Sequence, residues 1–136
     1  MSNTNNNLVE KNQLLAEMCA VLLRKYDVKE ALERQGIKSY ILWGAGQNGR
    51  IFLQWTKQCG IEAKKIVDIN AGIIIDGIKV SDPESVEYEA DAIIVTPIEA
   101  FSEIRNYLKD KTTAQVISLK ELIEEFMVCP IRNRLA

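Results

Sequence analysis

The chain has 136 residues, of which 47% are hydrophobic and 26% are charged, and its 17 basic and 19 acidic side chains leave a net charge of -2. This length and balance indicate one soluble domain with a hydrophobic core of its own, and they exclude a two-domain enzyme. The absence of histidine excludes histidine-based triads and most zinc sites, and the slightly acidic balance argues against a nucleic-acid partner.

The amino-terminal part of the sequence predicts a short disordered tail followed by helices. Residues 1–7 (MSNTNNN) are polar and rich in asparagine, so we expect ordered structure to begin near Leu8. Residues 8–36 predict a helical extension. Asp27 interrupts it as a candidate cap for a second helix, with Glu30 completing a capping-box-like pair and Gly36 ending that helix. The apolar stripe of the first helix is formed by Leu15, Met18, Cys19, Leu22 and Tyr26.

Residues 37–128 alternate between short apolar strands and amphipathic helices. The predicted strands are 39–43, 65–68, 78–80, 91–95 and 115–117, with a tight turn at Asp76-Gly77 before the third strand. The predicted helices cover 47–58, a short turn opened by Asp82 and Pro83, and two segments of about ten residues that begin at Thr96-Pro97 and at Ser118. Such alternation is typical of a parallel sheet with helices on both faces.

A glycine-rich loop follows the first predicted strand. Gly44-Ala45-Gly46-Gln47-Asn48-Gly49 matches the pattern GxGxxG and opens the helix 47–58, and Asp68 stands 19 positions after the last glycine at the end of the next strand. The first glycine permits a sharp turn, the second permits close approach of a phosphate, and the third permits close packing of helix and strand. The unpaired N–H groups of the helix amino terminus favour a diphosphate, so the loop predicts a nucleotide site.

The candidate ligand-binding residues lie in this loop and at two neighbouring strand ends. Asp68 is expected to accept hydrogen bonds from ribose hydroxyls and to repel a 2′-phosphate, while Arg50 adds positive charge beside the phosphates. Alternatives stay open for most of these residues. Asp68 and Asn70 can form the turn after their strand, Arg50 can be solvated, Thr96 can cap the next helix, and the glycines can serve packing alone. The full set is Gly44, Ala45, Gly46, Gln47, Asn48, Gly49, Arg50, Asp68, Asn70 and Thr96.

Three further features of the sequence bear on chemistry and location. Tyr107 and Lys111 match the YxxxK pair of short-chain dehydrogenases, but they close the helix after the fourth strand, so we assign no catalytic residue. The three cysteines, Cys19, Cys59 and Cys129, form no CxxC pair and are expected to be small buried hydrophobic residues in a reducing compartment. No apolar run approaches the roughly 18 residues of a membrane span, so we expect a cytoplasmic protein.

The segments YILWGAGQNGR, KIVDIN, DGIKVSDPESV and DAIIVTP resemble, in this order, a Rossmann-like module of nucleotide-sugar and surface-polysaccharide proteins. This module is the amino-terminal domain of acyltransferases that modify UDP-amino-sugars and the carboxy-terminal domain of sugar C-methyltransferases, and it is fused to other polysaccharide enzymes. Its strand-end aspartate and following hairpin are matched by Asp68, Gly77, Ile78 and Val80. The resemblance implies binding of NAD or a UDP-sugar. It does not carry over acyl transfer, because the catalytic histidine and the repetitive second domain are missing here.

Together these features predict an α/β fold: a Rossmann-like three-layer sandwich with a mainly parallel five-stranded sheet in the order 3-2-1-4-5, an amino-terminal helical extension, and a tail at 129–136. The leading hypothesis is a non-catalytic module that binds a nucleotide or nucleotide sugar in polysaccharide metabolism. One alternative is an NAD-dependent epimerase-like or methyltransferase-like domain that works with a partner chain. The other is an assembly domain that forms a homodimer through the amino-terminal helix, with Leu15, Met18, Leu22 and Tyr26 in contact.

Overall fold

The computed structural model describes residues 2–23 and 27–128, so Tyr26, Cys129 and the predicted tail at 129–136 lie outside the described residues. Its centre is a six-stranded sheet with the order β3-β4-β2-β1-β5-β6. All pairs are parallel except β3 with β4. Without β3 this is the predicted order, so the Rossmann-like α/β fold is confirmed. The strands are β1 (Tyr40–Trp43), β2 (Ala63–Val67), β3 (Ile74–Ile75), β4 (Ile78–Ser81), β5 (Ala92–Val95) and β6 (Gln115–Ser118).

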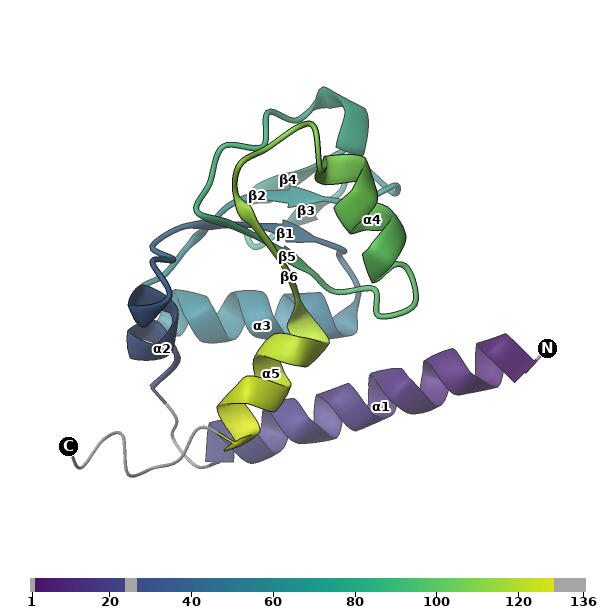
Figure 1. Cartoon of the computed structure of the whole chain (residues 1–136), viewed down its shortest axis with the longest axis vertical. Helices are drawn as coiled ribbons and strands as arrows, with labels where there is room; N and C mark the ends of the chain where they lie inside the picture. The colour runs from purple at the N-terminus through teal and green to yellow at the C-terminus, as the bar shows by residue number, and fades with distance from the viewer. Residues whose placement is uncertain (1, 24–26, 129–136) are drawn as a thin grey trace.

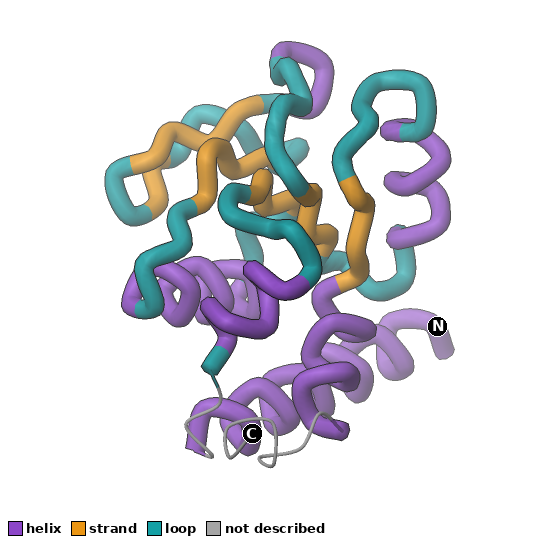
Figure 2. The backbone as a smooth tube through the Cα atoms, turned by 60° about the vertical axis from the view of Figure 1, so that its left-hand side comes forward, coloured by secondary structure: helices purple, strands orange, loops and turns teal. Residues whose placement is uncertain are grey.

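Helices cover both faces of the sheet (Figures 1 and 2). One face carries α2 (Val28–Arg34), α3 (Gln47–Gln58) and α5 (Leu119–Val128), with α1 (Ser2–Leu23) packed outside them, and α4 (Phe101–Leu108) covers the other face. A short 3-10 turn, η1 (Pro83–Ser85), is capped by Asp82 as predicted, because the Asp82 carboxylate accepts a hydrogen bond from Glu84 N. No helix in the described ranges combines the length and apolarity that a bilayer crossing requires.

The strands of the sheet centre supply both halves of the core. In β1, Tyr40 and Leu42 belong to the cluster under α1, α2, α3 and α5, whereas Ile41 and Trp43 belong to the cluster under α4. Successive side chains of a strand point to opposite faces, so a fully buried strand must be apolar throughout. This requirement explains why the runs YILW and AIIV could be recognised as central strands from the sequence.

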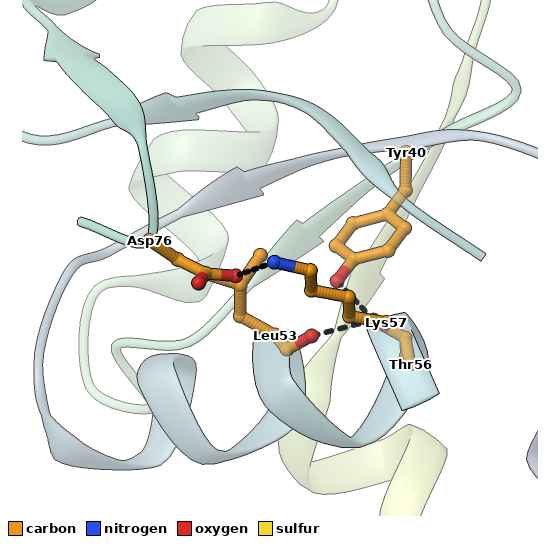
Figure 3. A network of polar contacts seen from close by, with 5 residues as sticks. All are labelled: Tyr40, Leu53, Thr56, Lys57 and Asp76. Atoms are coloured by element: carbon orange, nitrogen blue, oxygen red, sulfur yellow. Dashed lines mark hydrogen bonds and ion pairs between the residues drawn. The ribbon is translucent and has the colours of Figure 1, made fainter. Parts of the chain in front are cut away.

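The predicted turn at Asp76-Gly77 forms a two-residue hairpin between β3 and β4. Asp76 has φ of 53° and Gly77 has φ of 81°, and Ile75 pairs directly with Ile78. Positive φ at both central positions is the geometry of a type I′ turn, which Asp-Gly favours. Lys57 Nζ lies 3.0 Å from Asp76 Oδ2, so an ion pair connects the hairpin to α3 (Figure 3).

The helical extension differs from the prediction in its start and in its buried face. Helix α1 begins at Ser2, inside the segment for which we expected no order, because a helix extends readily over polar residues once later residues have nucleated it. Its buried residues are Leu14, Met18 and Val21. The predicted stripe was therefore wrong in phase: of its described members only Met18 is buried.

The second helix of the extension forms with Asp27 as its cap, as predicted, but the Glu30 carboxylate pairs with Arg34 instead of completing the capping box. Asp27 Oδ1 accepts a hydrogen bond of 2.9 Å from Glu30 N, and Gly36, with φ of 80°, follows the end of α2. The cysteine prediction was wrong for Cys19, which is exposed on α1. Cys59, just after α3, is half-buried, and burial raises the pKa of its thiol.

A buried polar contact fixes α3 on the sheet. Tyr40 of β1 and Thr56 of α3 are both fully buried, and their hydroxyl oxygens lie 2.6 Å apart (Figure 3). Because the Thr56 hydroxyl donates to Leu53 O, the Tyr40 hydroxyl must donate to Thr56. An unpaired hydroxyl here would cost about 1–3 kcal/mol, so this short chain of hydrogen bonds selects one position of α3 against β1.

Replacing Tyr40 with phenylalanine keeps the ring and removes this donor, and we expect the free energy of unfolding at neutral pH to fall by about 1 kcal/mol. Burial raises the pKa of Tyr40. The protonated phenol therefore stabilises the fold fully below about pH 10, and this contribution is lost as the pH rises toward the raised pKa. Urea unfolding at pH 7 and at about pH 10.5 should show a smaller alkaline loss for Tyr40→Phe than for the wild type. An equal loss would contradict this role of Tyr40.

Candidate functional site

The glycine-rich loop joins the carboxyl end of β1 to the amino end of α3, at the centre of the sheet. Gly44 N donates to Val67 O at 2.8 Å, which extends the pairing of β1 with β2 by one residue. Gly46 then occupies the N-cap position of α3 in an extended conformation and provides no side-chain cap. The crossover helix therefore starts at the carboxyl edge of the sheet, where ligands bind in open α/β folds.

Two of the three glycines are required by close packing. Gly44 has φ of 110°, and a Cβ at this position would clash with Thr96 Oγ1. A Cβ at Gly49 would clash with the carbonyl oxygen of Gly44 and would lie 3.3 Å from Thr96 Cγ2. The predicted roles in turning the chain and in packing the helix against the strand are thus those the structure shows for Gly44 and Gly49.

Gly46 has a different environment. A Cβ at this position would meet no atom within 4 Å, and Gly46 and Gln47 are exposed. The first amides of any helix have no intrahelical acceptor, and here no side chain at the N-cap replaces one. Packing within the described residues therefore does not explain a glycine at position 46, whereas close approach of an external anion would.

Asp68 lies between this loop and the turn that follows β2. Its Oδ2 accepts a hydrogen bond of 2.7 Å from Ala45 N, and its Oδ1 accepts one of 2.9 Å from Asn70 N. Asn70 thus takes part in the turn through its backbone, which was one of the two interpretations of the sequence. The half-buried carboxylate faces the glycine loop and keeps β2 and the loop together.

Thr96 does not cap the helix after β5, and the prediction of a helix start at Thr96-Pro97 was wrong. Helix α4 begins only at Phe101. Both Thr96 N and Thr96 Oγ1 donate to Trp43 O, at 2.9 Å and 3.1 Å. The backbone therefore continues the pairing of β5 with β1 past Val95, and the hydroxyl is used to fill the space above Gly44 rather than to cap a helix.

Two polar side chains at the start of α3 contact neighbouring backbone. Arg50 Nε donates to Ala45 O at 3.0 Å, which holds the guanidinium beside the loop. Asn48 Nδ2 donates to Lys11 O of α1 at 3.3 Å, and Asn48 Oδ1 is buried without a partner in the described part of the chain. Arg50 is therefore a cation in direct contact with the loop, and Asn48 connects the loop to α1.

A hollow of about 560 Å³ lies at the carboxyl edge of the sheet and is lined by Ile69, the residue that follows Asp68. Its apolar lining includes Trp43 at the end of β1, Ile69 directly after Asp68, and Tyr107 of α4, and its carboxylates come from Asp82, Glu84 and Glu103. Ile69 is 83% exposed, an unusual environment for a large apolar side chain. Sequence reasoning missed Ile69, although its place directly after the strand-end aspartate was a usable signal.

Tyr107 and Lys111 do not form an acid/base pair. Lys111 Nζ lies over the Tyr107 ring, 4.2 Å from its centroid, and the Tyr107 hydroxyl is directed toward Pro83 O. Burial, followed by the carboxylates of Glu84 and Asp82, raises the pKa of Tyr107. A YxxxK tyrosine needs a lowered pKa, so this geometry offers no support for catalysis by Tyr107.

No known protein family and no curated protein matches this sequence. Among solved structures, the chain is similar to the crystal structure of RSP in complex with beta-NADH, with 20% sequence identity and a TM-score of 0.44, over 73% of this chain and 62% of the RSP chain. It is also similar to the crystal structure of RSP, a Rex-family repressor, with 20% identity and a TM-score of 0.49, over 79% of this chain and 64% of that chain. The chain thus spans less than two thirds of the RSP chain in each comparison.

The different environments of the glycines predict different costs of substitution. Gly44→Ala combines positive φ with a clash against Thr96, so we expect a loss of at least about 3 kcal/mol in the free energy of unfolding. Gly46→Ala meets open space, so its cost should stay within about 1 kcal/mol. Urea denaturation of both variants measures the difference. Similar losses in the two variants would mean that Gly46 is also a packing residue.

Proposed function

We propose that the chain binds a nucleotide containing a diphosphate and a ribose, of which NAD is the leading candidate. The observation that carries this proposal is the combination at one sheet edge of an open glycine at Gly46, an uncapped amino end of α3, and the inward-facing carboxylate of Asp68. Each part alone is common in proteins. Together they supply partners for a phosphate and for a neighbouring sugar.

The diphosphate is assigned to the amino end of α3. Gly46 and Gln47 are exposed residues, the first N–H groups of a helix have no intrahelical acceptor, and the helix dipole adds partial positive charge at this end. Arg50, held against the loop through Ala45 O, adds a full charge within the first turn. The open space at Gly46 allows a phosphate to approach the backbone, whereas a side chain would keep it away.

The ribose is assigned to Asp68. An ionised carboxylate has about four acceptor sites, and backbone amides occupy two of those of Asp68. Two acceptor sites therefore stay available for the hydroxyl pair of a ribose, while the negative charge disfavours a 2′-phosphate. For Thr96 we propose a positioning role, because its hydroxyl already donates to Trp43 O and holds the space above Gly44.

The base is assigned to the 560 Å³ hollow lined by Ile69, the residue that follows Asp68. Its apolar side chains suit a flat ring, and Ile69 would lose its unfavourable exposure when covered. The carboxylates of Asp82, Glu84 and Glu103 accept hydrogen bonds and donate none when ionised. They therefore favour a base with an amino group, such as adenine, over uracil, whose exocyclic groups are carbonyls. This favours NAD over a UDP-sugar.

Calorimetric titration with NAD, ADP-ribose, UDP and a UDP-sugar tests the proposal. The wild type should bind the two adenine compounds, and Gly46→Val should weaken that binding at least about tenfold while unfolding like the wild type. Thr113→Val, an exposed substitution before β6 at the opposite edge of the sheet, is the control and should bind normally. If no compound binds, or if both variants bind equally, the proposal is wrong. Binding confined to the UDP compounds would refute the assignment of the base.

Ile69→Ala separates the base hollow from the phosphate site. Because Ile69 is largely exposed, its truncation should change the free energy of unfolding by less than about 0.5 kcal/mol. Loss of its contact with the base should weaken the binding of ADP-ribose about tenfold and leave the binding of inorganic diphosphate unchanged. Titration of the variant with both compounds measures this contrast. Unchanged affinity for ADP-ribose would place the base elsewhere.

A further inference from the structure

Helix α1 carries a second apolar face that the described residues of the chain cover only in part. The face that packs inward is formed by Leu14, Met18 and Val21. A neighbouring face contains Leu8, which is 58% exposed, Leu22, which is 37% exposed, and the half-buried Leu15. Figure 1 shows α1 on the outside of the molecule. Leu22 lines the hollow between α1 and α3, so this face is most exposed toward Leu8.

The spacing on this outer face is that of a coiled-coil seam. Leu8, Leu15 and Leu22 recur every seven residues, as the d positions of a heptad repeat do. The a positions between them are Asn12 and Cys19, both exposed. A seven-residue leucine repeat with one asparagine at an a position is typical of parallel two-stranded coiled coils, in which paired asparagines specify register and dimeric state. The seam is defined here as these five residues.

We propose that two copies of this chain associate in parallel through this seam, with α1 packed against α1 of the second copy. The pattern selects a second copy because each leucine is then covered by its own equivalent and Asn12 is hydrogen-bonded by Asn12 of the second copy. The seam contains no ionisable carboxylate or ammonium group, so no like charges face each other across it. This proposal does not depend on nucleotide binding. The homodimer contact predicted from the sequence included Met18, and the seam omits it because Met18 faces the core of its own chain.

The seam is short, which sets the strength of the contact. From Leu8 to Leu22 it spans about 21 Å of helix, or two heptads. Leu14, Met18 and Val21 already hold α1 as a helix in the single chain. Association therefore does not have to supply the free energy of ordering this helix. We therefore expect a dimer whose population depends on protein concentration rather than a permanent one.

Sedimentation equilibrium of the full chain over a range of concentrations tests the association. The wild type should approach twice the monomer mass, and Leu15→Gln should raise the dimer dissociation constant about 100-fold, since two leucines leave the seam. Gln13→Ala, an exposed site of the same helix outside the seam, is the control and should associate like the wild type. Circular dichroism verifies that both variants keep their helices.

Cross-linking tests the orientation without weakening the seam. In the variant Cys59→Ser/Cys129→Ser, copper phenanthroline should oxidise Cys19 and its equivalent to one interchain disulfide, because a parallel seam places these thiols face to face. The variant Cys19→Ser/Cys129→Ser, which keeps Cys59, is the control and should stay unlinked. A monomer at all concentrations, or a dimer unaffected by Leu15→Gln, would overturn the proposal. A dimer sensitive to Leu15→Gln in which Cys19 does not cross-link would overturn the parallel arrangement.

Discussion

The carboxyl edge of the sheet can receive the amino end of α3 only because glycine occupies positions 44 and 49. Any side chain at Gly49 would collide with the carbonyl of Gly44, and any at Gly44 would collide with Thr96. The Asp68 carboxylate then holds the loop in place through Ala45 N. Three chain segments, the ends of β1, β2 and β5, therefore meet at one point through backbone and side-chain hydrogen bonds. The position of every group assigned to the ligand follows from this meeting point.

Among the three glycines of the loop, only Gly46 is not explained by packing within the described residues of the chain. The conformations of Gly44 and Gly49 are explained by contacts within the chain, and Tyr40 and Thr56 hold the same helix from its other end. At Gly46, by contrast, an added Cβ would meet no atom within 4 Å, so no steric contact requires glycine there. A loop that served only to connect a strand to a helix would stabilise α3 better with serine or aspartate at the N-cap. The glycine there is best understood as a feature of recognition, in line with the exposed Ile69 and the acceptor-rich hollow beside it.

Much of the fold could be predicted from the sequence because the signals were local. Apolar runs specified the strands, Asp76-Gly77 specified the hairpin, and the glycine pattern located the loop. The predictions were wrong where one residue or helix had two possible partners within the fold. Apolar residues surround much of α1, so the sequence alone could not show that Leu14 rather than Leu15 would face inward. The Thr96 hydroxyl could satisfy either a helix amide or the Trp43 carbonyl, and the geometry of the sheet decided for the carbonyl.

The central claim is that the backbone amides at the start of α3 contact the phosphates of a bound nucleotide. Nitrogen-15 NMR spectra of the labelled chain, recorded while ADP-ribose is added, observe these amides directly. The account predicts that the largest shifts fall on Gly46, Gln47 and their helical neighbours. Smaller shifts should fall near Asp68 and Ile69, and the amide of Thr113, just before β6 at the opposite edge of the sheet, should not shift. Saturating shifts confined to another surface, or a spectrum that does not change, would contradict it.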